Sequence, residues 1–343
     1  MEAFISSFSL SNLENIGKDL NLPTIDVLFS LLEDVITILE SENPDYRPVC
    51  ELTGLPGGLL DFSSKSPVPI IVVPDLHARY NFLLNILRYK PQFEKSMFDG
   101  TKSIWDLLLS SEIKIICVGD GLHSELHKFR WLAAYNDFAK GFSTGDAMTQ
   151  EMSESLALMQ IVMTLKKLFP DCFHFLKGNH ENILNSSRLG NHAFRKFVQE
   201  GEMVRLFMID YYGEDILRLY SLFETSLPLC AICSNCIISH AEPLNAYDKN
   251  QLIDSLIDSD IILGLTWTSN GDSSKDSVKK MLKNLLPNEK NAIYFGGHRP
   301  VSENYALRQD GKFIQIHNPT RQNIGIVLPN TKFNPEIHIV SVV

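Results

Sequence analysis

The feature that most constrains this chain is an apolar stretch that ends in a carboxylate and an imidazole. Residues 70–73 are Ile-Ile-Val-Val, and Asp75 and His77 follow them closely. The β-branched run predicts a buried strand, and ligands in open α/β sheets bind at the carboxyl ends of strands. Because alternate positions of an extended segment point the same way, we expect Asp75 and His77 to be able to close on one ion.

The same pattern recurs along the chain. Asp120 follows an apolar run at residues 113–118, and Asn179 and His180 follow one at residues 172–176. His240 follows the run at residues 236–239, and His298 follows the run at residues 292–296. One such strand end carries little information. Five in one chain, with glycines beside them that let the backbone turn sharply, predict a shared site.

The order of the patterns predicts the fold class. Helical periodicity follows the first strand and returns at residues 123–141, 149–168 and 191–221, whereas strand patterns dominate after residue 290. We therefore expect an α/β fold, a two-sheet β-sandwich flanked by helices, with a helical insert around residues 123–170.

The first 66 residues form a separate block in the sequence. Thr24 is placed to cap a helix whose apolar stripe ends at Leu39, and the stretch at residues 63–69 is typical of a linker. We predict a helical N-terminal extension and linker over residues 1–66 and a main domain over residues 67–343. The apolar stripe either packs on the main domain, which we favour, or binds a protein partner.

Charge and composition argue against several classes of protein. The formal net charge is −10 and the pI about 5.5, so we do not expect a broad basic surface for nucleic acid. No apolar run approaches the roughly 20 residues that span a bilayer, and the N-terminus lacks the basic region of a signal peptide. Six cysteines in 343 residues do not form a disulfide framework. We expect a cytoplasmic protein with no membrane partner.

The strand-end residues form a mixed set of metal ligands. Imidazoles with carboxylates suit Mn, Fe, Zn or Co better than Ca or bare Mg. Each residue could instead be a strand-end group with an ordinary hydrogen bond, and for His240 or Asp75 taken singly we would prefer that explanation. Together they are too many for one small ion and suit two metal ions that share a bridging carboxylate. The set is Asp75, His77, Asp120, Asn179, His240 and His298.

The motif order resembles the calcineurin-like metallophosphoesterase superfamily, and within it the phosphoprotein-phosphatase branch. Asp-x-His, Gly-Asp, Gly-Asn-His-Glu, His and Gly-His occur in that order. Gly297-His298-Arg299-Pro300 carries one histidine, as in that branch, and Leu227-Pro-Leu-Cys-Ala-Ile resembles its hairpin before the fourth motif. The resemblance runs from about residue 70 to 328, without the helical insert near residues 123–170, and implies a metallophosphoesterase domain.

The resemblance also implies roles for these residues. Asp75, His77 and Asp120 would hold the first metal, and Asp120, Asn179, His240 and His298 the second, with Asp120 bridging. Mn, Fe or Zn are the metals expected. A hydroxide held by both metals would attack phosphorus in a phosphoester, and His180 would protonate the leaving group, because imidazole titrates near neutral pH.

The second motif departs from the family pattern. His123 stands where the family has the aspartate that orients the acid histidine, and Ser124 stands where it has a phosphate-binding arginine. We expect His123 to line the pocket. Arg79 and Arg299 lie beside ligand motifs and are the best substitutes for the missing cation; a surface salt bridge is the plainer reading of each.

Two classes of function follow. The first is a metal-dependent phosphatase acting on a phosphorylated protein or on a small phosphoester such as a nucleotide. The second is a metal-binding scaffold or regulatory protein of the same fold, for which Ser124 and the apolar N-terminal helix are the supporting features.

Overall fold

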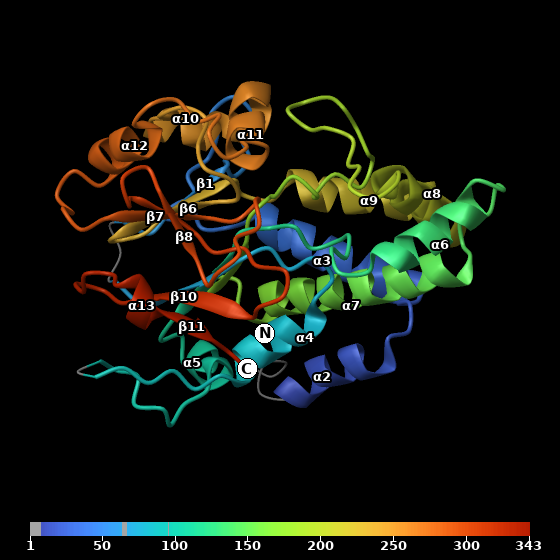
Figure 1. Cartoon of the computed structure of the whole chain (residues 1–343), viewed down its shortest axis with the longest axis horizontal. Helices are drawn as coiled ribbons and strands as arrows, with labels where there is room; N and C mark the ends of the chain where they lie inside the picture. The colour runs from blue at the N-terminus through green and yellow to red at the C-terminus, as the bar shows by residue number, and fades with distance from the viewer. Residues whose placement is uncertain (1–7, 64–66, 95) are drawn as a thin grey trace.

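The computed structural model describes residues 8–63, 67–94 and 96–343. Residues 64–66 of the predicted linker and residues 1–7 of the N-terminus, on which the signal-peptide argument depends, lie outside these ranges. Two mixed sheets pack face to face and helices cover both outer faces (Figure 1). The predicted fold class is confirmed. No helix within the described ranges is long and apolar enough to cross a membrane.

The first sheet has five strands in the order β11-β10-β2-β3-β4. β2 runs parallel to β3 and β3 parallel to β4, whereas β10 is antiparallel to both β2 and β11. Its strands, in chain order, are β2 (Ile70–Val73), β3 (Lys114–Cys117), β4 (Phe173–Phe175), β10 (Asn323–Val327) and β11 (Ile339–Ser341).

The second sheet has six strands in the order β1-β5-β6-β7-β9-β8. β6, β7 and β9 are parallel neighbours, so their carboxyl ends lie at one edge. Its strands are β1 (Leu59–Asp61), β5 (Cys230–Ile232), β6 (Cys236–Ser239), β7 (Ile293–Gly296), β8 (Ala306–Arg308) and β9 (Phe313–Gln315).

The alternation of side chains along the strands builds the core. Ile70 and Val72 of β2 face the second sheet and pack in one cluster with residues such as Phe295. Ile71 and Val73 point to the other side and pack against helices. Strands that are buried on both faces need no polar alternation, which is why these runs are continuously apolar.

Helices cover the two outer faces. The five-stranded sheet is covered by α2 (Leu10–Asp19), α3 (Ile25–Glu40), α4 (Tyr80–Arg88), α5 (Ile104–Leu109), α6 (Lys128–Phe138), α7 (Asp146–Leu168), α8 (Glu200–Tyr212) and α9 (Glu214–Thr225). The six-stranded sheet is covered by α10 (Lys249–Ile253), the 3₁₀ turn η1 (Asp254–Ile257), α11 (Ser259–Thr266) and α12 (Ser277–Leu285), and α13 (Pro335–His338) precedes β11. The predicted insert corresponds to α6 and α7.

The N-terminal block belongs to the same core. Thr24 caps α3 by accepting from the Val27 N–H at 3.4 Å, as predicted. Leu28, Leu32 and Val35 of α3 are fully buried in the cluster that contains α7 and α9. The apolar stripe therefore packs within the chain, and a protein partner bound through it is not supported. The block also contributes β1, which pairs in parallel with β5.

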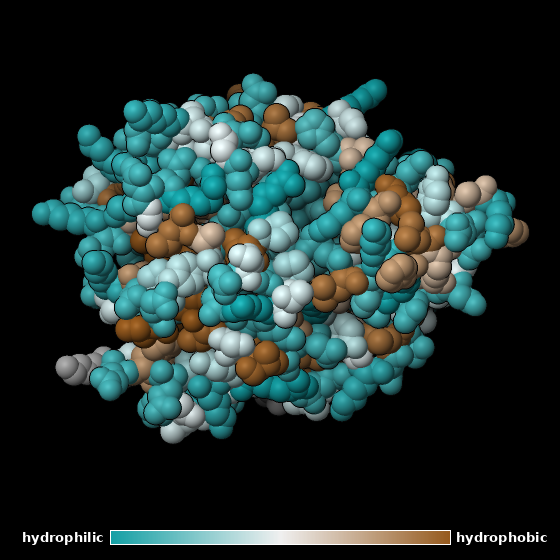
Figure 2. Space-filling view, in the orientation of Figure 1, coloured by the Kyte–Doolittle hydropathy of each residue, from teal (hydrophilic) through white to brown (hydrophobic). Residues whose placement is uncertain are grey.

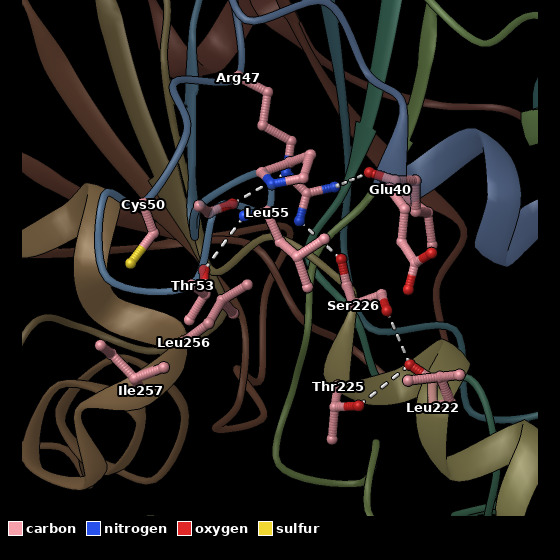
Figure 3. A pocket seen from close by; sticks show the side chains of 13 residues that line it. Glu40, Arg47, Cys50, Thr53, Leu55, Leu222, Thr225, Ser226, Leu256 and Ile257 are labelled. Carbon is pink, nitrogen blue, oxygen red and sulfur yellow. Dashed lines mark hydrogen bonds between the residues drawn. The ribbon is translucent and has the colours of Figure 1, made fainter.

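Arg47 ties this block to the rest of the chain. Its side chain is 1% exposed, and the guanidinium donates to the carbonyl oxygens of Gly57 at 2.8 Å and Ser226 at 2.6 Å. The Glu42 carboxylate accepts a further bond at 2.5 Å. Figure 3 shows Arg47 beside a cavity between the end of α3, the following loop and the end of α9; no predicted metal ligand lines it. These contacts position α3 and β1 on the core.

The buried His174 gives a prediction about stability. Burial first, and Lys166 second, lower the pKa of His174 from 6.5 to about 4 in the folded protein. Between those values the unfolded chain binds a proton that the folded chain does not, so acidification favours unfolding. As the pH is lowered from 6.5 to 4, the free energy of unfolding of wild type should decrease more steeply than that of His174→Asn. The difference between the two slopes should be up to about 1.4 kcal/mol per pH unit.

Urea unfolding of metal-free wild type and His174→Asn across this pH range measures that difference. The asparagine oxygen can still accept from Lys166 Nζ, which lies 3.3 Å from His174 Nδ1. Parallel pH profiles would contradict the assignment. The carboxyl group of Glu42 also has a lowered pKa in the folded protein, but it changes the free energy of unfolding mainly below pH 4.5. Most of its effect therefore lies outside the pH range in which His174 acts.

Candidate metal centre

The predicted ligands meet where the two sheets end. Asp75 follows β2, Asp120 follows β3 and Asn179 follows β4 of the first sheet. His240 and His298 follow β6 and β7 of the second sheet. Both carboxylates and His240 are at most 1% exposed. Parallel strands bring their carboxyl ends to one edge, so residues far apart in sequence share one buried site.

Two glycines leave room for the carboxylates. A Cβ on Gly178 would lie 2.2 Å from Asp120 Oδ1, and one on Gly297 would lie 1.8 Å from Asp75 Oδ2. No side chain fits at such distances. His77, Asp120 and His298 themselves have φ values of 44°, 56° and 61°, which non-glycine residues rarely adopt. Strain of this kind is concentrated at functional sites.

Asp120 Oδ2 lies at the centre of the cluster. It is 3.5 Å from His77 Nε2, 3.5 Å from His240 Nε2 and 3.8 Å from His180 Nε2. This buried oxygen nevertheless has no hydrogen-bond partner. A buried acceptor without a donor is costly unless something else satisfies it, and a cation between the carboxylate and the imidazoles would do so.

The surrounding backbone fixes the orientation of two imidazoles. His77 Nδ1 lies 3.0 Å from the His123 carbonyl oxygen, and His240 Nδ1 lies 3.0 Å from that of Val118. A carbonyl only accepts, so each Nδ1–H donates and each Nε2 presents its lone pair to the centre. Metal-binding histidines are usually oriented in this way.

Asn179 marks a second point of convergence. Its Oδ1 lies 2.8 Å from His240 Nε2 and 2.9 Å from His298 Nδ1. Burial lowers the pKa of His240, so the neutral ring has one N–H, which Val118 already accepts. Oδ1 and Nε2 therefore face each other as two electron-pair donors, an arrangement that suits a shared cation.

The electrostatics of the cluster also suit metal ions. Burial lowers the pKa of His77 to about 4 and that of His123 to about 3. Burial, together with the Glu181 and Asp75 carboxylates, raises the pKa of Asp120 well above its usual value. Neutral imidazoles are the form that binds metals, and a bound cation would favour the ionised form of Asp120. Two groups of side chains around Asp120 have suitable spacing: His77, Asp120 and His180, and Asp75, Asp120 and His240.

Glu181 holds the two ligand loops together. Its carboxylate accepts from the N–H groups of Asp120 at 2.8 Å, Gly121 at 2.8 Å and Gly178 at 2.6 Å. The sequence showed this residue as part of Gly-Asn-His-Glu but gave it no role. Three backbone bonds to one buried carboxylate fix the position of the central aspartate.

His180 and His123 lie together beside the centre. The backbone N–H of His180 donates to Asp120 Oδ1 at 2.9 Å, and the ring Nδ1 atoms of the two histidines are 3.0 Å apart. Burial, with neighbouring imidazoles, lowers the pKa of His180 well below its usual value. The Phe194 ring packs on His180, with centroids 3.7 Å apart.

The segment that carries Phe194 differs from prediction. Residues 191–199 have no helix, and α8 begins only at Glu200. The Glu200 side chain accepts from the N–H groups of Lys196 at 2.9 Å and Val198 at 3.1 Å, which competes with helix formation. The segment instead packs Phe194 against His180 and brings Lys196 to Glu125.

The two predicted phosphate-binding arginines lie in different surroundings. Arg79 donates to backbone carbonyls, among them Asp75 at 2.5 Å and Asn318 at 3.0 Å, and so joins two loops. These contacts do not favour a phosphate role for Arg79, which stays a prediction. Arg299 is exposed next to His298 and donates to Ser269 Oγ.

The replaced positions of the second motif are also defined. Ser124 is buried and its Oγ lies 2.9 Å from His127 Nδ1, so it offers no charge to the centre. Past it, Leu126 and Phe129 are 51% and 85% exposed. Figure 2 shows apolar surface in the region where Figure 1 places α6 and α8.

The structure was compared with known proteins. No family model and no curated protein sequence matches the chain. A protein serine/threonine phosphatase from Saccharomyces cerevisiae with similarity to human phosphatase PP5 matches with a TM-score of 0.58 and 15% identity, covering 93% of this chain and 89% of that one.

Two further structures match less well. A cold-active protein-tyrosine phosphatase of a psychrophile Shewanella has a TM-score of 0.46 and 13% identity, over 80% of this chain and 78% of that one. A putative diadenosine tetraphosphatase has a TM-score of 0.41 and 14% identity, over 83% and 97%. The fold assignment rests on the yeast phosphatase: the chain has the metallophosphoesterase-type fold that its motifs predicted.

Proposed function

We propose that this protein is a phosphoester hydrolase that uses two divalent metal ions. Asp75, His77 and Asp120 would hold one ion, and Asp120, Asn179, His240 and His298 the other. The observation that carries the proposal is Asp120 Oδ2, buried and without a hydrogen-bond partner, 3.5 Å from the Nε2 atoms of both His77 and His240. An oxygen in this position could be shared by two ions.

When bound, two such ions polarise a phosphoryl group and supply a nucleophile from water at neutral pH. The chain's own residues would do the rest. His180 lies beside Asp120, where it can donate a proton to the leaving oxygen. Arg299 and Lys196 are exposed cations near the ligands and could bind phosphoryl oxygens. Phe194 covers His180 and limits its access to water.

The substrate class is a second part of the proposal. A phosphorylated protein is favoured by the likeness to a serine/threonine phosphatase and by the exposed apolar side chains of Leu126 and Phe129 beside the second motif. A small phosphoester such as a nucleotide is the alternative. The scaffold reading remains the competing function, and the buried, uncharged Ser124 is the observation that favours it.

We expect metal-stripped protein to be inactive and activity to return with Mn(II), Fe(II) or Zn(II) more than with Mg(II), since the site is rich in imidazole. The assay is hydrolysis of p-nitrophenyl phosphate and of its bis ester, followed by phosphopeptides and nucleotides. The preference between mono- and diester narrows the substrate class.

The matched control is Asp310→Asn, which changes an exposed carboxylate that pairs with Lys279. It should have wild-type activity with every metal. No turnover with any metal, in protein that binds two ions per chain, would move the conclusion to the scaffold function.

A further inference from the structure

His317 has an unused nitrogen that faces the metal centre. It follows β9, so it is one more histidine at a strand end of the second sheet, and it is fully buried. Its Nδ1 has no hydrogen-bond partner and lies 3.4 Å from Asp75 Oδ2. Asp75, His77 and His317 each offer a ligand atom within 4.8 Å of the others.

Glu125 fixes the orientation of this ring. Glu125 Oε2 lies 2.8 Å from His317 Nε2, and a carboxylate accepts, so Nε2–H is the donor. In the neutral ring the lone pair is then on Nδ1, on the side of Asp75. The other oxygen of Glu125 contacts Lys196 and lies 3.7 Å from His77 Nε2. A carboxylate behind a histidine is the usual support of a metal ligand.

We propose that His317 is a further ligand of the ion held by Asp75 and His77, and that Glu125 is its positioning residue. The inference rests on the proposed dinuclear site and adds a second imidazole to its first ion. An additional nitrogen ligand should favour Mn(II), Fe(II) or Zn(II) over Mg(II) at that position.

The competing explanation is a simple ion pair. A protonated His317 could bridge Glu125 and Asp75 with both N–H groups and bind no metal. That arrangement needs a hydrogen bond from Nδ1 to Asp75, and the geometry of this contact does not provide one. The two explanations predict different metal binding, so they can be separated by experiment.

The test measures metal binding directly, without reference to activity. Mn(II) stoichiometry and affinity are determined for full-length wild type, His317→Gln, Glu125→Gln and the control His338→Gln. His338 is also buried but contacts Phe93 and Phe333 instead of the centre. We expect two ions in wild type and His338→Gln. One of the two should bind about 10- to 100-fold more weakly in Glu125→Gln, and at least as weakly in His317→Gln.

Pulsed electron paramagnetic resonance of the Mn(II) protein counts coordinated imidazole nitrogens and should show one fewer in His317→Gln. Glu125→Gln keeps the shape of the side chain, so it serves if His317→Gln does not fold. Two ions with wild-type affinities and an unchanged nitrogen count in the variants would overturn the role of His317 but leave the dinuclear site intact. Absence of bound Mn(II) in wild type would overturn both.

Discussion

Asp120→Asn is expected to lower the metal-dependent rate by about 10³-fold or more and to reduce the number of tightly bound ions. Asp120 Oδ2 lies 3.5 Å from both His77 Nε2 and His240 Nε2. An amide nitrogen in its place carries no lone pair for a metal. Loss of several kcal/mol of electrostatic stabilisation corresponds to about that decrease in rate.

The Asp120→Asn substitution should remove a metal ligand without disturbing the metal-free fold. The other oxygen of Asp120, Oδ1, accepts a hydrogen bond from the backbone N–H of His180 at 2.9 Å, and the Oδ1 atom of the asparagine can keep this bond. The metal-free variant should be at least as stable as metal-free wild type, because burial makes the Asp120 carboxylate unfavourable and raises its pKa.

The decisive measurement is therefore thermal unfolding with and without Mn(II). Added metal should raise the melting temperature of wild type by mass action but should have little effect on Asp120→Asn. The exposed Asp310→Asn is again the control. Wild-type activity and metal stabilisation in Asp120→Asn would exclude a bridged two-metal site.

The sequence predicted the fold and the proximity of the six predicted ligand residues because both depend on local patterns. A continuous apolar run such as residues 70–73 is buried on both faces, and the polar residue after it lies at the strand end. Parallel pairing then brings Asp75 and Asp120 together without further information. Elements without such patterns were missed: β8 is short and partly exposed, and β1 lies in a turn-rich stretch.

Contacts between distant segments could not be read from the sequence. Glu125 and His317 are 192 positions apart, and the sequence showed only that His317 ends a strand. The sequence placed Arg79 beside a ligand motif, but the left-handed backbone at His77 and Ala78 turns its side chain toward the carbonyls of the loop after β9. Side-chain direction at strained turns depends on tertiary packing, and residue spacing does not specify it.

If His180 is a general acid, the hydrolysis rate should depend on whether the leaving group of the substrate needs a proton. If His180 protonates the leaving oxygen, His180→Asn should slow the hydrolysis of an alkyl phosphate such as phosphoserine by about 10²- to 10⁴-fold. The effect on p-nitrophenyl phosphate should be much smaller, because that leaving group departs without a proton. The bond from the backbone N–H of residue 180 to Asp120 survives the substitution, and metal content verifies it.

An equal loss for both substrates would contradict the acid role and indicate that His180 acts through the position of Asp120.

A second variant tests the same step in the opposite direction. Burial first, and then neighbouring imidazoles, His123 among them, lower the pKa of His180, so wild type should turn over alkyl phosphates slowly. His123→Asp places a carboxylate near His180 Nδ1, which is 3.0 Å from His123 Nδ1, and should raise that pKa. We therefore expect His123→Asp to increase the rate for phosphoserine and to leave the rate for p-nitrophenyl phosphate nearly unchanged.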